Sequence, residues 1–256
     1  MNESNMWKET DEEILQQIPE KLLTWYDKNA RVLPWREDPR PYRVWVSEIM
    51  LQQTRVEAVK PYFARFMERL PDIEALAEVD DDELLKLWEG LGYYSRARNL
   101  KAAAQQIVTE YGGEMPSDYR ELLKLKGIGS YTAGAVSSIA FKQPNPAVDG
   151  NVLRVISRVL YRRDNILDAK VKRRIEGEIK EILPERTGDF NQSLMELGAT
   201  VCLPNGAPKC NECPLQELCR AHLVGDEESL PVKTKAKKRK IEQRTVFLLV
   251  CDGKIA

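Results

Sequence analysis

Histidine is almost missing from this sequence of 256 residues, in which His222 stands alone. This argues against a mechanism that depends on a histidine base and against a metal site built from several histidines. Long apolar runs are missing too, since none approaches the ~20 residues that a membrane-spanning helix needs. Residues 1–10 are polar and lack the apolar segment of a secretory signal. We therefore expect a cytoplasmic protein that does not bind a membrane.

An excess of charge of either sign is also missing, because 39 Lys and Arg stand against 40 Asp and Glu, a net charge of −1. The charges are nevertheless unevenly spread. Acidic side chains gather in 72–83 and basic side chains in 154–174. A protein that binds nucleic acid with a single phosphate-facing side would show this distribution. Two solvated helix faces would show it equally well, so charge alone leaves both interpretations open.

Helical patterns dominate the chain, which predicts an all-α fold. Thr10 and Glu13 match a capping box before an apolar stretch, and Pro19 suits the start of a second helical stretch. Glycine and proline breakers separate the further helices. These helices are expected near 42–54, 56–69, 81–89, 95–111, 118–125, 131–141, 150–162, 170–183 and 189–200.

The composition changes near the end of the chain. Residues 225–244 are predicted to be a basic linker, and their last part, 231–244, holds seven basic residues without apolar periodicity. The segment TVFLLVCDGKIA (245–256) has the pattern of one β-strand followed by an Asp-Gly turn. Because a single strand cannot fold alone, we expect the chain to end just inside a second, β-containing domain.

Four of the five cysteines stand close together, separated by seven, two and five residues: Cys202, Cys210, Cys213 and Cys219. Four thiolates at this spacing suit a tetrahedral metal ion or an iron–sulfur cluster. Zinc sites favour two separated C-x-x-C pairs, whereas only Cys210 and Cys213 form such a pair here. A cluster is therefore favoured over zinc, and both stay open. The position after the last long helix predicts a structural role.

The segment LKGIGSYTAGAV (125–136) joins two helices through a tight turn. Gly127 and Gly129 allow positive φ and leave the backbone amides uncovered. At the start of the next helix, these N–H groups would form an anion site suited to a DNA phosphate. A plain corner between helices has the same pattern. The small residues that follow predict close packing of the second helix.

Two carboxylates are expected in opposite environments. On a helix, Glu48 has Val44, Trp45 and Leu51 as neighbours, so burial should raise its pKa and keep it neutral. Asp149 precedes a helix, where backbone N–H groups and the helix dipole should lower its pKa. One neutral acid and one ionised carboxylate are the pair expected for cleavage of a glycosidic bond. The plain alternatives are a solvent-facing glutamate and a simple N-cap.

Taken together, these features resemble the MutY-type adenine DNA glycosylases, which share a superfamily with endonuclease III. The resemblance covers about residues 20–256. It is carried by seven motifs in order: LPWR (33–36), SEIMLQQT (47–54), GLGYYSRARNL (90–100), LKGIGSYTAGA (125–135), AVDGNV (147–152), FNQSLMELGA (190–199) and the cysteine run (202–219).

The resemblance implies a role for each motif. Glu48 would protonate N7 of adenine, Asp149 would stabilise the oxocarbenium-like sugar, and Tyr131 and Asn151 would line the same site. Base flipping needs residues that wedge into the stack, a role implied for Gln53, Thr54 and the turn at 91–93. The residues implied to bind the flipped adenine or the DNA are Arg31, Trp35, Arg36, Gln53, Thr54, Leu91, Gly92, Tyr93, Gly127, Gly129 and Gln192. The ligands implied for a 4Fe–4S cluster are Cys202, Cys210, Cys213 and Cys219.

Tyr131 stands where the endonuclease III branch has a lysine that forms a Schiff base. A tyrosine cannot form one, so we expect base excision without strong strand cleavage. Two departures from the family pattern stand out. The first cysteine gap holds seven residues instead of six, which makes Cys202 the least secure ligand. The family also carries a C-terminal domain resembling Nudix hydrolases, of which 245–256 would be only the start, so the opposite-base preference stays open.

The implied architecture is a helix-hairpin-helix DNA glycosylase with two helical modules, a DNA-binding cleft between them and an iron–sulfur cluster knot. Residues 31–139 would form a six-helix barrel module, and 1–30 with 140–224 would form the module that holds the cluster. The implied partner is duplex DNA with adenine opposite 8-oxoguanine or guanine, bound by a monomer associated with a bacterial-type nucleoid. Two alternatives are a non-catalytic mismatch-binding protein and an endonuclease III-like pyrimidine-lesion glycosylase/lyase.

Overall fold

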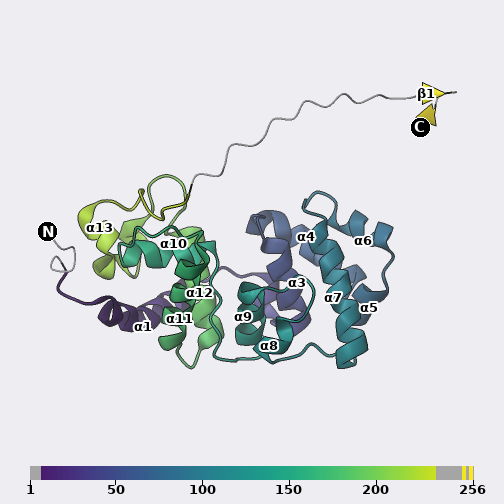
Figure 1. The fold of residues 1–256 in the computed structure, drawn as a ribbon, viewed down its shortest axis with the longest axis horizontal. Coiled ribbons are helices and arrows are strands. Elements are labelled where there is room, and N and C mark those ends of the chain that lie inside the picture. Colours follow the sequence, from purple (N-terminus) through teal and green to yellow (C-terminus); the bar gives the residue numbers. More distant parts are fainter. Residues whose placement is uncertain (1–6, 235–249, 252–253, 256) are drawn as a thin grey trace.

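A computed structural model describes residues 7–234, 250–251 and 254–255. In the first of these ranges the chain forms helices joined by loops and turns, without strands (Figure 1). Its helices are α1 (Asp11–Asn29), α2 (Pro34–Glu37), α3 (Pro41–Leu51), α4 (Val56–Arg69), α5 (Ile73–Glu78), α6 (Asp81–Trp88), α7 (Ser95–Tyr111), α8 (Tyr119–Leu122), α9 (Ser130–Ile139), α10 (Gly150–Val159), α11 (Ala169–Glu181), α12 (Thr187–Thr200) and α13 (Arg220–Val224). Two 3₁₀ turns, η2 (Cys210–Glu212) and η3 (Gln216–Leu218), lie between α12 and α13. The all-α prediction is confirmed for this range.

The helices α2 to α9 enclose one hydrophobic core, and we call this group the first module. Large side chains fill the core, among them Trp45, Phe63, Phe66 and Trp88. The rings of Phe66 and Trp88 meet edge to face at 6.1 Å. Helix α3 packs against α4, α7 and α9, so nearly all its side chains are buried. Such surroundings suit a helix that is apolar on all sides.

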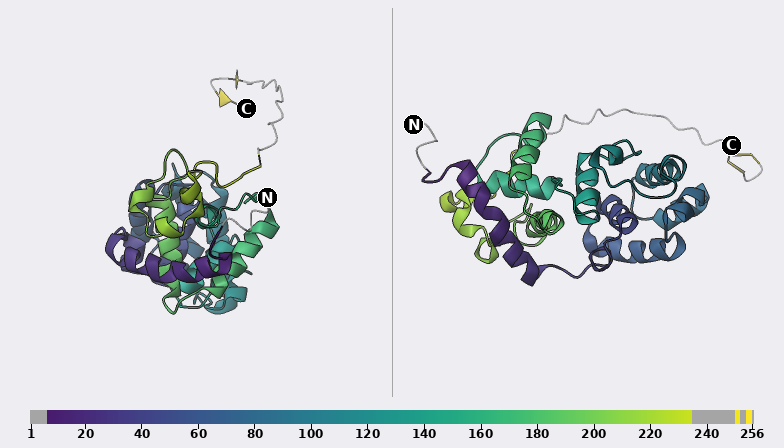
Figure 2. Two further views of the ribbon diagram at one scale, coloured as in Figure 1. Left: turned by 90° about the vertical axis from the view of Figure 1, so that its left-hand side faces the viewer. Right: turned by 90° about the horizontal axis from the view of Figure 1, so that it is seen from below.

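The helices α1 and α10 to α13 share a separate core, and we call this group the second module. Ile18 and Leu22 of α1 pack there with Ile156 of α10 and Phe190 of α12. Figures 1 and 2 show α1 beside helices from the far end of the chain, with the first module on the other side. The chain passes from the first core to the second between Ala147 and Val148. The module boundaries expected from the sequence stay predictions.

The modules join where α9 crosses α12, and small or amide side chains make this crossing tight. A Cβ on Gly134 would lie 2.0 Å from the carbonyl oxygen of Pro146. Asn191, which is fully buried, accepts from the backbone N–H of Ala147 at 3.1 Å and donates to Ser138 Oγ at 2.9 Å. The close packing predicted for the helix after the hairpin is therefore confirmed.

The predicted capping box is present, because Thr10 and Glu13 exchange hydrogen bonds at the start of α1. The expected break at Pro19 is wrong, since α1 runs unbroken through this residue. Ile18 and Leu22, on either side of the proline, are both fully buried in the second core. Tertiary packing therefore outweighs the loss of one backbone hydrogen bond.

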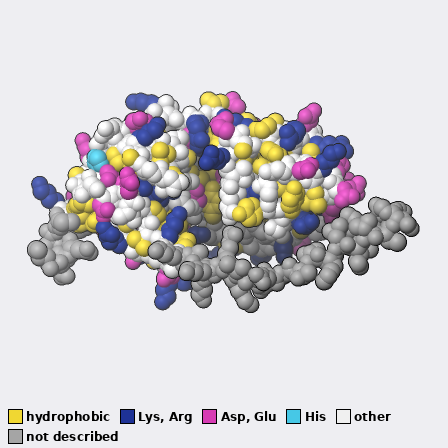
Figure 3. All heavy atoms as spheres, turned by 90° about the horizontal axis from the view of Figure 1, so that it is seen from above, with side chains coloured by type: hydrophobic (Ala, Val, Ile, Leu, Met, Phe, Trp, Pro, Cys, Tyr) yellow, Lys and Arg dark blue, Asp and Glu magenta, His cyan; other side chains and the backbone are white. Residues whose placement is uncertain are grey.

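Three of the eight basic residues in 154–174 contact the protein and do not contribute to a phosphate-facing side. Arg154 and Arg158 are only 5% and 2% exposed. Arg162 is held mainly by ion pairs to acidic partners that include Asp11 of α1. Figure 3 shows Lys and Arg side chains spread over both modules on the face it presents. The interpretation as a single basic face is therefore wrong for these three arginines, which bind the protein itself.

The C-terminal expectations are tested only in part. Strand β1 (Val250–Cys251) pairs antiparallel with β2 (Lys254–Ile255), so one predicted strand is found together with a second that the pattern did not indicate. Half of the predicted linker, 235–244, and residues 245–249, 252–253 and 256 of the predicted strand segment lie outside the described residues. Among the helices described, none combines the length and the apolar character that crossing a lipid bilayer requires.

Candidate active site

Glu48 is buried in the first module, as its apolar neighbours on α3 predict. It is 7% exposed and accepts a hydrogen bond of 2.5 Å from the hydroxyl of Tyr131 on α9. Burial raises the pKa of Glu48 to about 7, although the bond from Tyr131 and the charge of Arg36 act to lower it. The side chain therefore changes its protonation state near neutral pH, as a catalytic acid must.

Tyr131 stands at the start of α9, directly after the hairpin. Burial and the nearby carboxylates Glu48 and Asp149 raise the pKa of Tyr131 well above its ordinary value of 10.0. The phenol is thus a neutral donor at all ordinary pH values. Its oxygen also lies 3.3 Å from the sulfur of Met195 on α12, so it contacts both modules.

Asp149 caps α10 in the second module. One oxygen accepts from the backbone N–H groups of Asn151 and Val152 at 2.8 and 2.9 Å, and the other accepts from the Asn151 amide at 2.6 Å. The expectation of a lowered pKa is nevertheless wrong. Burial raises the pKa of Asp149, and these hydrogen bonds with the charge of Arg154 offset the rise only in part.

The two carboxylates interact across the junction of the modules. The negative charge of Asp149 raises the pKa values of both Glu48 and Tyr131. Asp149 accepts three hydrogen bonds from donors that favour its charged form, whereas Glu48 accepts one. Asp149 should therefore lose its proton first, which leaves Glu48 as the neutral partner of the pair.

Asn151 connects Asp149 to the second module. Its amide oxygen accepts from Arg154 at 2.9 Å, while its nitrogen donates to Asp149. The side chain lies against Gly198 of α12, where an added Cβ would come within 2.5 Å of the Asn151 Cβ. The asparagine thus fixes the direction of the second carboxylate oxygen.

A cluster of polar side chains lies near Glu48 and joins the predicted residues Arg31, Arg36 and Gln192. At its centre is Glu196 of α12, whose side chain is fully buried. Arg31 and Arg36 bind its carboxylate at 2.6 and 2.8 Å, and Arg36 also donates to Gln192 at 3.1 Å. Burial raises the pKa of Glu196, but the two guanidinium groups outweigh it and the net direction is down. Glu196 was not predicted from the sequence, although this residue stands four positions after Gln192 and therefore on the same helix face.

Trp35 makes none of the polar contacts of this cluster. It is 5% exposed and meets Phe63 edge to face at 5.3 Å in the core of the first module. The role of Trp35 in holding a base stays a prediction, because the polar contacts of the cluster do not include it.

Two turns of the first module carry the residues predicted to enter the DNA. Gln53 and Tyr93 both have positive φ, 59° and 50°, which is uncommon for residues other than glycine. Tyr93 is 64% exposed, whereas Leu91 is 6% exposed and belongs to the core. Of these two residues in the second turn, Tyr93 is therefore the one whose side chain reaches solvent, whereas Leu91 packs in the core.

The hairpin between α8 and α9 depends on one glycine and not on two. Gly127 has a φ of 77°, and a Cβ there would lie 2.8 Å from the Cβ of Asn99. Gly129 has a φ of −102° and caps α9 with open space around it, so the expectation of positive φ is wrong for this residue. Its lack of a side chain still leaves the amides at the start of α9 open to an anion.

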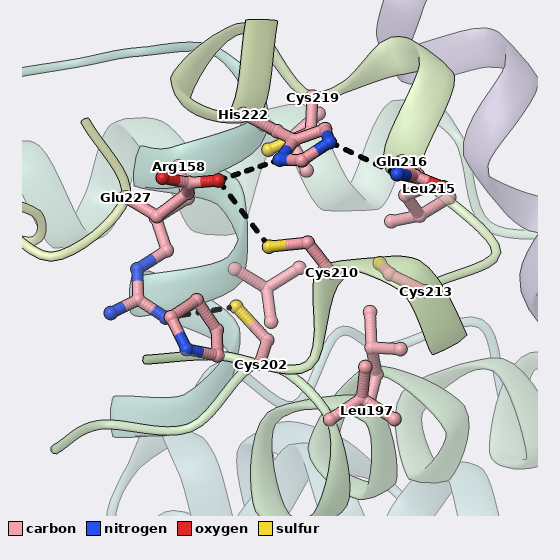
Figure 4. A pocket seen from close by; sticks show the side chains of 14 residues that line it. Arg158, Leu197, Cys202, Cys210, Cys213, Leu215, Gln216, Cys219, His222 and Glu227 are labelled. Carbon is pink, nitrogen blue, oxygen red and sulfur yellow. Dashed lines mark hydrogen bonds and ion pairs between the residues drawn. The ribbon is translucent and has the colours of Figure 1, made fainter. Parts of the chain in front are cut away.

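The four clustered cysteines line one pocket together with side chains of α10 and α12 (Figure 4). The Arg158 guanidinium donates to the sulfur of Cys202 at 3.2 Å. Burial raises the pKa of Cys213 to about 12, so a bound cation would be needed to favour its thiolate. Four sulfurs and an arginine in one pocket fit a thiolate-ligated metal or iron–sulfur cluster.

The single histidine, His222, also lines this pocket. His222 Nδ1 is 2.6 Å from a carboxylate oxygen of Glu227, and this carboxylate accepts from the thiol of Cys210 at 3.4 Å. Ligand atoms of Cys210, His222 and Glu227 lie within 4.8 Å of one another, the one such group of three among the described residues. The cysteine pocket therefore has a polar wall on this side.

Comparison with known proteins points to one superfamily. Residues 46–181 match the family described as "HhH-GPD superfamily base excision DNA repair protein". The adenine DNA glycosylase of Rattus norvegicus is 47% identical over 211 residues, which are 78% of this chain and 41% of the rat protein. That of Buchnera aphidicola (strain Bp) is 40% identical over 228 residues, 88% of this chain and 64% of the relative. The chain thus spans about two fifths to two thirds of these relatives.

Solved structures agree with this assignment of the fold. A thermostable thymine-DNA glycosylase is 27% identical, with a TM-score of 0.72 over 84% of this chain and 97% of that one. A trapped endonuclease III–DNA covalent intermediate is 26% identical, with a TM-score of 0.71 over 85% of this chain and 99% of that one.

Proposed function

Because the chain belongs to the HhH-GPD superfamily of base excision DNA repair proteins, we propose that it excises adenine from duplex DNA by hydrolysing the N-glycosidic bond. The relatives named above are adenine DNA glycosylases, and they support the choice of base. The observation that carries the proposal is the pairing of buried Glu48, whose pKa is about 7, with partly buried Asp149 of the other module, whose charge contributes to that raised pKa.

In the first step, neutral Glu48 donates its proton to N7 of an extruded adenine. The bond between C1′ of the sugar and N9 then breaks, and its electron pair leaves with the base. Tyr131 keeps the acid in place through the hydrogen bond between its hydroxyl and Oε2 of Glu48. A proton supplied by a positioned acid contributes about 10²–10⁴-fold to such a step.

In the second step, ionised Asp149 faces the positive charge that develops on the sugar. Its fixed position at the start of α10 means that little reorganisation is needed when this charge appears. A water molecule then adds to C1′, and the Glu48 carboxylate takes up its proton. The acid is thereby restored for the next turnover.

Adenine would be recognised by the cluster around Glu196. The fully buried Glu196 carboxylate would hold Arg31 and Arg36 in place, and these two side chains can donate to ring nitrogens of the base. All three side chains are already held by each other, so the donors and acceptors are arranged before the base arrives. A site of this kind rejects bases that leave its buried polar groups unpaired.

We further propose that the protein removes the base without cutting the strand. The residue next to Glu48 on α9 is Tyr131, whose oxygen cannot form a Schiff base with the sugar. Two lysines lie near the hairpin. Of these, Lys124 is paired with Glu121 at 2.7 Å, and Lys126 is exposed.

A 4Fe–4S cluster is the cofactor that the cysteine pocket would hold, through Cys202, Cys210, Cys213 and Cys219. When bound, it would tie the loop after α12 to α13 and thereby fix the second module, a structural contribution. Buried Arg158 would balance part of the negative charge of the four thiolates.

The partner would be duplex DNA with adenine opposite 8-oxoguanine or guanine. The test is single-turnover excision on duplexes with adenine opposite 8-oxoguanine, guanine and thymine, read as strand breaks that appear only after alkali. The proposal requires adenine release from at least the first duplex. If protein with full cluster absorbance releases no adenine from any of them, the proposal is wrong.

Variants assign the chemistry to residues. Glu48→Gln and Asp149→Asn should each keep DNA binding and lose excision. The control Glu68→Gln, which changes an exposed carboxyl on α4, should keep both DNA binding and excision. Tight mismatch binding with unchanged DNA would instead favour a non-catalytic binder. A covalent adduct trapped by borohydride would favour the endonuclease III-like glycosylase/lyase.

A further inference from the structure

Arg96, near the start of α7, joins two turns that are about 40 residues apart in the sequence. Its side chain lies beneath both turns and donates five hydrogen bonds to backbone carbonyls. Nη1 donates to Ile49, Met50 and Gln52 at 2.8, 3.1 and 2.6 Å, and Nη2 donates to Leu91 and Gly92 at 2.9 and 3.2 Å.

The first three carbonyls belong to the C-terminal end of α3. The last carbonyls of a helix have no partner within it and carry partial negative charge, so a cation here stabilises the helix end. The guanidinium also lies over the rings of Trp88 and Tyr93, at 5.4 and 5.7 Å from their centroids. Trp88 in turn donates from its indole to the carbonyl of Gly92 at 3.1 Å.

Each bridged turn continues into a residue with left-handed backbone. Gln53 follows the carbonyl of Gln52, and Tyr93 follows the carbonyl of Gly92. A residue other than glycine is strained in this conformation and persists only where its surroundings hold it. Arg96 is the one side chain that holds both turns at once among the hydrogen bonds of the described residues.

We propose that Arg96 is the positioning residue that sets the separation and direction of Gln53 and Tyr93, and thereby the recognition of the base opposite the excised one. This rests on the proposed function, because it assumes that these two turns enter the DNA. Arg96 itself is half-buried, donates to the protein backbone and does not belong to the group that contains Glu48 and Asp149. It acts on the DNA through the turns.

Lysine cannot replace this arginine. The planar guanidinium offers separate nitrogens to two groups of carbonyls and a flat face to two rings, whereas an ammonium is a single point with three donors. Arg96→Lys keeps the charge and most of the stem but should release one of the two turns. Arg98→Lys is the matched control, because Arg98 is exposed on the same helix.

The experiment uses the full chain with its cluster and measures binding and single-turnover excision on three duplexes. Adenine stands opposite 8-oxoguanine, guanine or a tetrahydrofuran abasic analogue, which offers no opposite base to contact. Loss of hydrogen bonds made by a charged, half-buried group such as Arg96 corresponds to about 10–100-fold. We expect Arg96→Lys to weaken binding to the first two duplexes by about this factor, and to leave the tetrahydrofuran duplex within about twofold.

A second variant covers the case in which Arg96→Lys does not fold. Gly92→Ala keeps Arg96 but disfavours the φ of 69° at Gly92, and an added Cβ meets no atom within 4 Å. It should give the same selective loss. Unchanged binding in both variants, or an equal loss on all three duplexes, overturns the proposal. Binding of the wild-type protein to the 8-oxoguanine duplex is read by anisotropy, which does not depend on excision. A failure of the proposed chemistry can therefore be distinguished from a failure of the proposed role of Arg96.

Discussion

Replacing Glu48 with glutamine should make the folded protein more stable at alkaline pH. The pKa of Glu48 is about 7 in the folded protein, against an ordinary value of 4.5, because the carboxyl is buried. The folded state therefore holds this proton more tightly than the unfolded state does. The stability linked to it is fully present below pH 4.5 and is lost as pH rises towards 7.

The magnitude follows from the interval between the two pKa values. At about 1.4 kcal/mol per pH unit, ionised Glu48 lowers the free energy of unfolding by about 3 kcal/mol above pH 7. Glutamine keeps the volume of the side chain and can still accept from Tyr131, but it cannot ionise. The stabilisation from Glu48→Gln should therefore grow by about 2 kcal/mol between pH 5.5 and pH 8.

Urea unfolding followed by circular dichroism at the two pH values measures this difference. Glu196→Gln is the control with the opposite sign, since the two arginines lower the pKa of Glu196 and its charge adds stability above the unfolded pKa. That variant should be less stable than wild type by nearly the same amount at pH 5.5 and pH 8, and the deficit should shrink only as pH falls below the unfolded pKa of 4.5. A Glu48→Gln effect that is independent of pH, or destabilising at pH 8, would refute the reasoning.

Three further outcomes are expected. In Tyr131→Phe, the lost hydrogen bond no longer lowers the pKa of Glu48, so the alkaline limb of the single-turnover rate should move up by about one pH unit; a downward move contradicts this. Gly127→Ala forces a Cβ to 2.8 Å from Asn99 at a φ of 77°, so DNA affinity measured by anisotropy should fall on every duplex alike, and a loss confined to mismatches would count against a phosphate site. Cys213→Ser should remove the visible absorbance of a cluster and weaken DNA binding while the helical dichroism persists; retained absorbance would exclude Cys213 as a ligand.

The features that could be predicted from the sequence are the ones that neighbours along the chain determine. The capping box at Thr10 and the burial of Glu48 follow from patterns within one or two helical turns. Expectations about local backbone conformation that rest on a single proline or glycine are less reliable. Pro19 lies inside a helix because its flanking residues pack in a common core, and Gly129 needs no positive φ because Gly127 alone makes the turn.

The site residues that were missed take their roles from distant partners. Glu196 binds Arg31, which is 165 positions away in the chain, and Arg96 binds carbonyls between 4 and 47 positions away. The pKa of Asp149 could likewise not be predicted from neighbours in the sequence. Its N-terminal cap was visible in the sequence, but its burial between two modules was not, and burial decides the direction.

The arginines of this protein show why charge patterns in the sequence overstated the basic surface. Arg96 donates to two groups of carbonyls, and Arg154 donates to the carbonyls of Gly198 and Cys202. Each ties a helix end to a distant turn, which a guanidinium can do because its donors point in several fixed directions. The modules that present the two carboxylates are therefore held in part by arginines that donate to the protein backbone. Substituting such an arginine should change DNA affinity by shifting the turn that the arginine holds. This change in affinity should depend far less on salt concentration than the loss of a phosphate contact does.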